Sequence, residues 1–233
     1  MAFQTVFKRY EMKFKLNGEQ RKAIEGAISE HMEPDAFPRS SIYNIYFDTE
    51  NYLLARRSLE KPMYKEKLRL RSYGMPYGDS QVFVEIKKKF DSVVYKRRVS
   101  MGYDEAMEWL CGDVRRDNTQ IESEIQFFKD DYRPVPKVEL CYERQSFKGE
   151  NGFRLTLDTE VRARNFRGTG WTPLLDDGIT LMELKTPYAI PLWMVDVLSE
   201  NGIRKSSFSK YGKAYEMMEN TFTKEGMKEG ALA

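Results

Sequence analysis

Polar and apolar residues alternate one by one along several segments of the chain, and this period of two predicts β-strands. In Lys65–Arg71 all four odd-numbered residues are lysine or arginine, while Leu68 and Leu70 have the other parity. Because the side chains of a strand alternate between its faces, the four cations project to one side. The same reasoning predicts about eight strands, at 9–15, 41–48, 64–73, 81–89, 92–99, 136–147, 153–162 and 179–185.

Helical periodicity separates these strands. Asn17 is a suitable N-cap for a helix that runs to about Met32, with apolar residues at helical spacing. Further helices are predicted at 52–58, 104–110, 119–131, from the Pro187–Pro191 segment to about Leu198, and from the 204–211 segment to Met218. With no repeat or linker in between, the chain is predicted to form a single domain over residues 1–220, followed by a polar C-terminal tail at 221–233.

The charged faces of the strands predict the fold class. One charged face is typical of a strand with a solvated outer surface, and this alternative stays open for any single strand. Several such strands, each with an apolar face for helices to cover, favour an α+β fold. In that fold a closed antiparallel β-barrel of about eight strands forms a charged tunnel, with the helices packed outside.

The predicted tunnel is strongly cationic. Its cations are Lys13, Lys67, Arg69, Arg71, Lys87, Lys96, Arg154 and, if a bulge near Tyr142 shifts the parity, Arg144. Like charges this close repel, so the tunnel requires an anionic ligand, and a chain of phosphates is the natural match. The predicted tunnel carboxylates are Glu11, Glu85, Glu139, Glu160 and Glu183. They either pair with neighbouring cations or hold Mg²⁺ or Mn²⁺ against phosphates.

Composition narrows the function classes. The 233 residues carry a net charge of only +2, which disfavours nucleic-acid binding. The single histidine disfavours zinc and Ser-His-Asp chemistry. Cys111 and Cys141 are expected to be buried free thiols. Without a secretory signal or an apolar run of about 18 residues, no membrane insertion is expected and the predicted location is cytoplasmic.

Eight short motifs occur in an order and spacing that resemble a known family. The motifs are Arg9–Phe14, Lys67–Arg71, Val84–Lys87, Tyr95–Arg98, Tyr142–Arg144, Phe153–Asp158, Met182–Lys185 and Ser209–Tyr211. From about Phe7 to Met218, the chain resembles the polyphosphate polymerase domain of the vacuolar transporter chaperone (VTC) complex. That domain belongs to the triphosphate tunnel metalloenzymes, or CYTH-like superfamily.

The resemblance implies an activity and a set of site residues. The implied reaction transfers the γ-phosphoryl group of ATP to a growing inorganic polyphosphate chain. The implied catalytic cations are Lys13, Arg69, Arg71, Lys87, Lys96, Arg144 and Arg154. Further phosphate contacts are implied for Lys67, Lys185, Lys205, Ser209 and Lys210. A divalent cofactor, Mn²⁺ or Mg²⁺, is assigned to Glu183, with Glu11 as a second candidate ligand.

Two departures from the family pattern bear on this interpretation. Ser207 occupies a position that is usually basic, and Lys205 is the nearest candidate to compensate. Arg9 replaces the first glutamate of the Glu-x-Glu-x-Lys strand found in tunnel triphosphatases, which favours the polymerase branch. A free-standing domain of this type is expected to be bacterial. Two alternatives remain open: hydrolysis of triphosphate or nucleoside triphosphates in the same tunnel, and non-catalytic binding of polyphosphate.

Overall fold

One antiparallel sheet organises the whole chain. The computed structural model describes residues 10–60, 62–91 and 93–229, with side chains described as far as residue 219. The strands of the described part are β1 (Tyr10–Leu16), β2 (Glu33–Asp48), β3 (Tyr64–Tyr73), β4 (Gln81–Phe90), β5 (Val93–Gly102), β6 (Val135–Lys148), β7 (Arg154–Asn165), β8 (Thr172–Pro173), β9 (Thr180–Thr186) and β10 (Lys205–Ser206). Their order is β10-β1-β9-β7-β6-β2-β3-β4-β5, and β8 pairs with β7.

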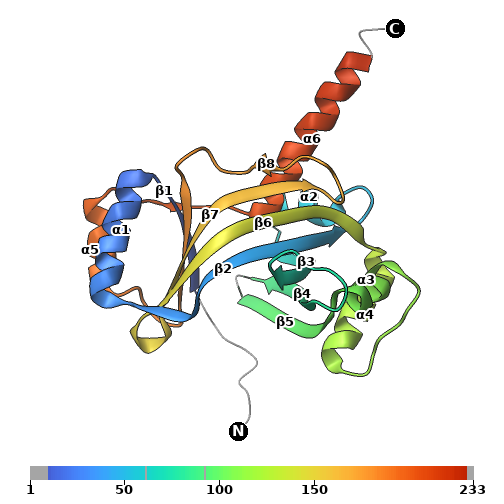
Figure 1. Cartoon of the computed structure of the whole chain (residues 1–233), viewed down its shortest axis with the longest axis horizontal. Coiled ribbons are helices and arrows are strands. Elements are labelled where there is room, and N and C mark those ends of the chain that lie inside the picture. Colours follow the sequence, from blue (N-terminus) through green and yellow to red (C-terminus); the bar gives the residue numbers. More distant parts are fainter. Residues whose placement is uncertain (1–9, 61, 92, 230–233) are drawn as a thin grey trace.

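The α+β class is confirmed, but the closed barrel is not. Hydrogen bonding within the described residues leaves the sheet with two ends, at β10 and β5. The sheet nevertheless curls, and Figure 1 shows β2, β6 and β7 as long curved strands. Lys87 Nζ of β4 lies 3.3 Å from Glu11 Oε2 of β1, although five strands separate β1 from β4 in the sheet. We call the face that carries Lys13, Arg69 and Glu85 the inner face.

Helices cover the outer face, as predicted. Helices α1 (Gly18–His31) and α5 (Leu192–Glu200) pack their apolar side chains on those of β1, β7 and β9. Helices α3 (Tyr103–Cys111) and α4 (Gln120–Tyr132) cover β2, β3 and β4, with Trp109 and Phe128 fully buried. The two helix pairs lie at opposite ends of the molecule (Figure 1). The predicted N-cap, Asn17, is confirmed, and it forms a capping box with Gln20 at the start of α1.

Helix α6 (Lys210–Glu229) departs from the prediction of outside helices. It packs Ala214, Tyr215 and Met218 against Ile42 and Leu140, among other residues. Ile42 shares the parity of Tyr46, which pairs directly with Arg69, so this contact lies on the inner face. The inner face is therefore charged in one part and apolar in another, and α6 covers the apolar part. The helix also continues to Glu229, where a polar tail was predicted.

A bulge in β7 changes which residues reach the inner face. The β6–β7 register shifts between Cys141 and Glu143, and the extra residue lies in β7, where Glu160 has a φ of 50°. The predicted bulge near Tyr142 of β6 is therefore wrong in its location, although Arg144 does reach the inner face. Glu160 is exposed rather than tunnel-facing. Glu139 is on the outer face, where it pairs with Arg164.

Several smaller features also differ from the sequence prediction. β2 begins at Glu33 rather than at Ser41, and β8 and β10 were not predicted. The cysteines are free, but Cys111 is exposed and Cys141 half-buried. Arg9 and Ser92 lie outside the described residues. In the part of the chain described, no helix is both long and apolar enough to cross a membrane. The remaining elements are α2 (Leu53–Leu59) and a 3₁₀ turn at Glu150–Gly152.

Candidate functional site

The inner face gathers charged side chains from seven strands and the start of α6. We call this set the cationic cluster. Its cations are Lys13, Lys67, Arg69, Arg71, Lys87, Lys96, Arg144, Lys185 and Lys210. Its carboxylates are Glu11, Glu85, Asp158 and Glu183. Nine positive groups thus face four negative ones.

Glu85 of β4 organises the first part of the cluster. It is only 2% exposed, and it accepts from Arg69 Nε at 2.8 Å and pairs with Lys96 Nζ at 2.6 Å. Burial alone would raise the pKa of Glu85, but Arg69, Arg71 and Lys96 lower it to about 2. The carboxylate therefore stays ionised, and its negative charge offsets the repulsion among the cations that share it.

Two buried tyrosines orient the arginines. Arg69 Nη1 donates to the Tyr46 hydroxyl at 3.0 Å, and Arg71 Nη2 donates to the Tyr142 hydroxyl at 3.2 Å. Burial would raise the pKa of Tyr46, but the neighbouring cations, Arg69 first, lower it to about 8. Sequence reasoning did not find these tyrosines, because their spacing is that of ordinary strand core.

Asp158 of β7 organises the second part. Arg144 binds it through two hydrogen bonds of 2.6 and 2.8 Å, and Lys210 Nζ lies 2.6 Å from its Oδ2. The side chain is 1% exposed; burial opposes ionisation, but Lys210 and Arg144 lower its pKa. Asp158 was not predicted as a site residue. Its parity, shared with Thr156 and Arg154, was the available signal.

Glu183 of β9 is the third buried carboxylate. Lys185 Nζ lies 3.1 Å away, and Lys13 is its direct partner across the β1–β9 pair. Burial would raise the pKa of Glu183, but Lys185, Lys13, Lys210 and Arg144 together lower it. The hydroxyl of Thr156, opposite Glu183 on β7, is buried and has no hydrogen-bond partner among the described residues.

The segment 208–211 crosses the inner face and is tied to several strands. Lys13 Nζ donates to the Phe208 carbonyl at 2.9 Å, and Lys67 Nζ lies 3.2 Å from the Ser209 hydroxyl. The Tyr211 ring stacks on Tyr46, with 4.5 Å between the ring centroids. The Tyr211 hydroxyl also donates to Asp48 Oδ2 at 2.6 Å.

Two lysines of the cluster hold their protons less tightly than a lysine in water does. Burial, together with repulsion from Lys65, Lys13 and Lys87, lowers the pKa of Lys67 to about 8, against the opposing effect of Tyr46. Burial likewise lowers the pKa of Lys96 to about 8, with Arg69 and Arg71 adding to the effect and Glu85 opposing it. An anion among these groups would stabilise their charged forms.

Two predicted phosphate contacts are not members of the cluster. Arg154, at the end of β7, stands opposite Lys185 on the inner face, but it is half exposed and pairs with Asp35 at 3.1 Å. Lys205 pairs with Phe14 in the β1–β10 register, so it shares the outer face with Phe14. Ser206 instead stands opposite Lys13, which places it on the inner face. Lys205 therefore does not compensate on the inner face for the serine at position 207.

The carboxylates suit a metal ion that arrives with its substrate. The described residues contain no group of three or more His, Cys, Asp or Glu side chains placed to hold a metal. Mg²⁺ at phosphoryl-transfer sites takes one or two carboxylates and completes its shell with phosphate oxygens and water. Glu183, buried and facing the unpartnered Thr156 hydroxyl, fits this pattern. Burial lowers the pKa of Lys13, and the nearby carboxylates of Glu183 and Glu11 oppose this effect, which places both close to the same cation.

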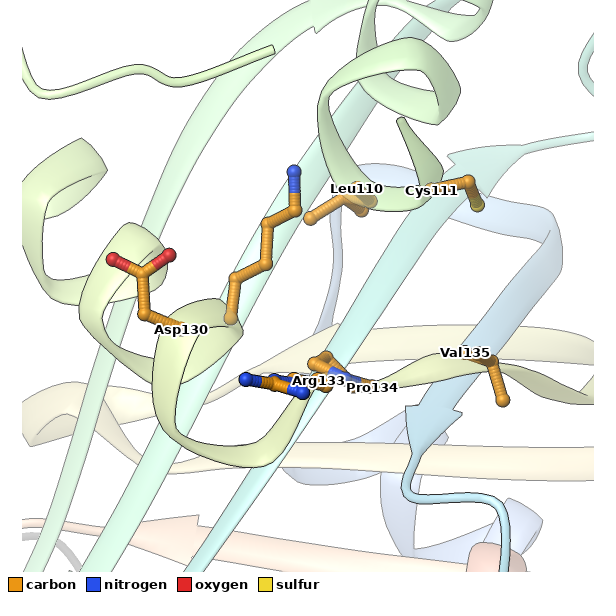
Figure 2. Close-up of a pocket in the computed structure, with 7 residues that line it drawn as sticks. Leu110, Cys111, Asp130, Arg133, Pro134 and Val135 are labelled. Atoms are coloured by element: carbon orange, nitrogen blue, oxygen red, sulfur yellow. The ribbon is translucent and has the colours of Figure 1, made fainter. Parts of the chain in front are cut away.

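A separate hollow lies near α3 and α4 (Figure 2). Its volume is about 460 Å³, and Cys111, Lys129, Asp130 and Arg133 are among its lining residues. Lys129 Nζ donates to the carbonyls of Gly112 and Val114, in the segment that follows α3. Its cation therefore has a structural role, and this hollow is not the candidate site.

Comparisons with known proteins agree with the fold. A family model described as the VTC domain matches residues 8–219. A putative adenylate cyclase from Bacillus halodurans is similar at 13% identity, with a TM-score of 0.55 over 88% of this chain and 96% of that chain. A putative adenylyl cyclase from Hippeastrum, described as having a dominant triphosphatase activity, is similar at 16% identity, with a TM-score of 0.52 over 88% and 94%. No curated protein matches the chain.

Proposed function

Because the chain belongs to the VTC domain family, we propose that it is a metal-dependent polyphosphate polymerase that uses ATP as phosphoryl donor. The observation that carries the proposal is the cationic cluster, in which nine cations face four carboxylates. An excess of five positive charges on a partly buried face favours a polyanion as ligand. Phosphate oxygens match both the forked donors of arginine and the point charges of lysine.

The reaction needs positioning and charge neutralisation rather than covalent help from the protein. A terminal oxygen of the phosphate chain attacks the γ-phosphorus of ATP, the bond from that phosphorus to the bridging oxygen breaks, and ADP leaves with the electron pair. Arg69, Arg71, Lys96 and Arg144 would hold the phosphates in line and stabilise the charge that develops on their oxygens. Glu183, with Glu11 as a second candidate, would hold the Mn²⁺ or Mg²⁺ ion. When bound, this ion neutralises the phosphate oxygens.

Hydrolysis in the same cluster is the second candidate. The Hippeastrum protein that shares the fold is described as having a dominant triphosphatase activity. The two reactions differ in the acceptor, which is water in one case and phosphate in the other. The same residues would bind the donor in both. The cytoplasmic location and the bacterial origin stay predictions.

The test is an incubation of the purified protein with ATP and Mn²⁺, with separate measurements of polyphosphate chains, ADP and free phosphate. Chains formed together with ADP support the polymerase. Free phosphate without chains supports the triphosphatase. If neither forms while tripolyphosphate still binds, the protein is a binding module and the catalytic proposal fails.

A matched pair of variants tests the metal assignment. Glu183→Gln should abolish turnover and largely preserve tripolyphosphate binding. Glu66→Gln changes another carboxylate of low exposure, paired with Lys88 away from the cluster, and should leave turnover unchanged. Full activity of Glu183→Gln would show that the metal assignment is wrong.

A further inference from the structure

Two aromatic rings and an arginine form an uncovered platform on the inner face. The rings of Tyr73 and Phe83 meet edge to face, with 6.1 Å between centroids and 84° between planes. The Arg98 guanidinium carbon lies 4.6 Å from the centre of the Phe83 ring. Tyr73 is 58% exposed, and neither ring belongs to the buried core. We call these three residues the aromatic platform.

The aromatic platform borders the cationic cluster. Phe83 is the direct partner of Arg71 across the β3–β4 pair, and Tyr73 follows Arg71 by two residues on the same face. Arg98 is the direct partner of Glu85 across the β4–β5 pair. Directly opposed side chains have Cβ atoms about 5 Å apart. A ligand whose phosphates reach Arg71 therefore has the platform immediately beside it.

The platform differs from the other tyrosines of the site. Tyr46 and Tyr142 are 6% and 3% exposed, and their hydroxyls accept from Arg69 and Arg71. These hydroxyls already have partners within the protein, the arginines that they orient. The Tyr73 ring, in contrast, is exposed to solvent, and the half-buried Phe83 ring beside it contacts the Arg98 cation. Single exposed aromatic residues are common, but a paired set next to a polyanion site is a stacking surface for a ligand with its own π-system.

We propose that the aromatic platform binds the purine base of a nucleoside triphosphate. This proposal rests on the proposed function, because it assumes that the triphosphate lies in the cationic cluster. The base stacks on the exposed ring of Tyr73 and meets Phe83 edge to face, because the planes of the two rings are 84° apart, and Arg98 adds a cation–π contact or reaches the adjoining phosphate. Inorganic polyphosphate has no π-face and gains nothing from the platform. The site thereby distinguishes the nucleotide donor from the phosphate chain.

The experiment compares a ligand that has a base with one that does not. Calorimetry would measure the dissociation constants of the β,γ-imido analogue of ATP and of tripolyphosphate, for the wild-type protein, Tyr73→Ala and Phe83→Leu. We expect Tyr73→Ala to lose about 5- to 150-fold in affinity for the nucleotide, the range for one stacked base, and Phe83→Leu to lose about 2- to 12-fold, the range for one edge-to-face contact. Tripolyphosphate affinity should stay within about twofold, and Tyr73→Trp should restore nucleotide affinity.

Tyr95→Ala provides the matched control. Tyr95 is also an exposed aromatic residue of the β3–β5 region, but it neighbours Lys96 and has the opposite parity, so it lies on the outer face. This variant should change neither affinity. Thermal unfolding of each variant would show that the fold is retained.

The outcomes separate this proposal from the function on which it rests. If wild-type protein binds tripolyphosphate, but the variants weaken both ligands equally or neither, the platform proposal is wrong and the proposed function stands. If wild-type protein binds neither ligand, the proposed function fails and the platform proposal fails with it.

Discussion

Replacing Glu85 with glutamine should destabilise the free protein and strengthen its binding of anions. The side chain is 2% exposed and is shared by Arg69 and Lys96, with Arg71 4.0 Å away. Glutamine keeps the volume but removes the negative charge, so these cations lose the group that compensates them. The same cations then become available to a phosphate chain, for which Glu85 competes.

The expected loss of stability in Glu85→Gln follows from the pKa of Glu85. The cations lower the pKa of Glu85 from its ordinary 4.5 to about 2, despite burial. One pKa unit corresponds to about 1.4 kcal/mol, so the ionised carboxylate contributes roughly 3 kcal/mol at neutral pH. Removing one partner of a buried ion pair typically costs about 3–5 kcal/mol, and this range agrees with the value obtained from the pKa. For a chain of this size the melting temperature should fall by roughly 6–12 °C.

The pH dependence has a definite sign. Because the folded-state pKa is lowered, the contribution is present above about pH 4.5 and is lost as the pH falls towards 2. Urea unfolding between pH 7 and pH 2.5 should show this loss in the wild-type protein. Glu85→Gln should lack this part of the acid dependence, and the two stabilities should converge at low pH.

Calorimetric titration with tripolyphosphate supplies the second half of the test. Glu122→Gln is the matched control, because Glu122 is equally buried and pairs with Arg116 in the α3–α4 region. It should cost stability without changing tripolyphosphate affinity. A fall in anion affinity in Glu85→Gln would refute the reasoning, since it would mean that Glu85 orients the arginines for phosphate rather than competing with it.

Three further predictions concern other parts of the site. Tripolyphosphate affinity should fall as the pH rises from 7 to 9.5, and binding should take up protons in buffers of different ionisation enthalpy, because Lys67 and Lys96 have pKa values of about 8 in the free protein. Thr156→Val should stabilise the free protein by about 1 kcal/mol in urea unfolding, because it removes a buried hydroxyl without a partner among the described residues; destabilisation would show that the hydroxyl is satisfied. Tyr211→Phe should cost about 2 kcal/mol by the same assay, because Asp48 loses a charged hydrogen bond, and an unchanged stability would show that this bond contributes little to α6 docking.

Much of the charged face could be predicted from the sequence, because parity survives wherever a strand is regular. In β3 and β4 the pattern places Arg69 and Glu85 on one face, and the structure pairs them directly. Lys13 and Glu183 follow the same rule across β1 and β9. The resemblance to the VTC domain, which the sequence motifs suggested, is confirmed over residues 8–219.

Parity fails where the backbone is irregular. Strand β7 contains one extra residue at the bulge around Glu160, whose φ is positive. Because of this extra residue, Arg162 lies on the face opposite to that of Asp158. Nothing in the local sequence marks this, because glutamate is not a residue that favours positive φ. The position of α6 on the inner face also could not be predicted from the local sequence pattern. Its apolar stripe fits either face of the sheet, and long-range contacts such as Tyr211 to Asp48 decide between them.

The position of β1 in the sheet has a consequence for synthesis on the ribosome. Strand β1 is the first to emerge, but its partners β9 and β10 begin at Thr180 and Lys205. At ordinary translation rates the interval is roughly ten to thirty seconds. Strands β2 to β5 form a consecutive meander and can pair in the meantime. Until the last segment arrives, β1 exposes both edges, which invites pairing with another nascent chain. Completion of the sheet therefore waits for the segment from Thr180 to Ser206.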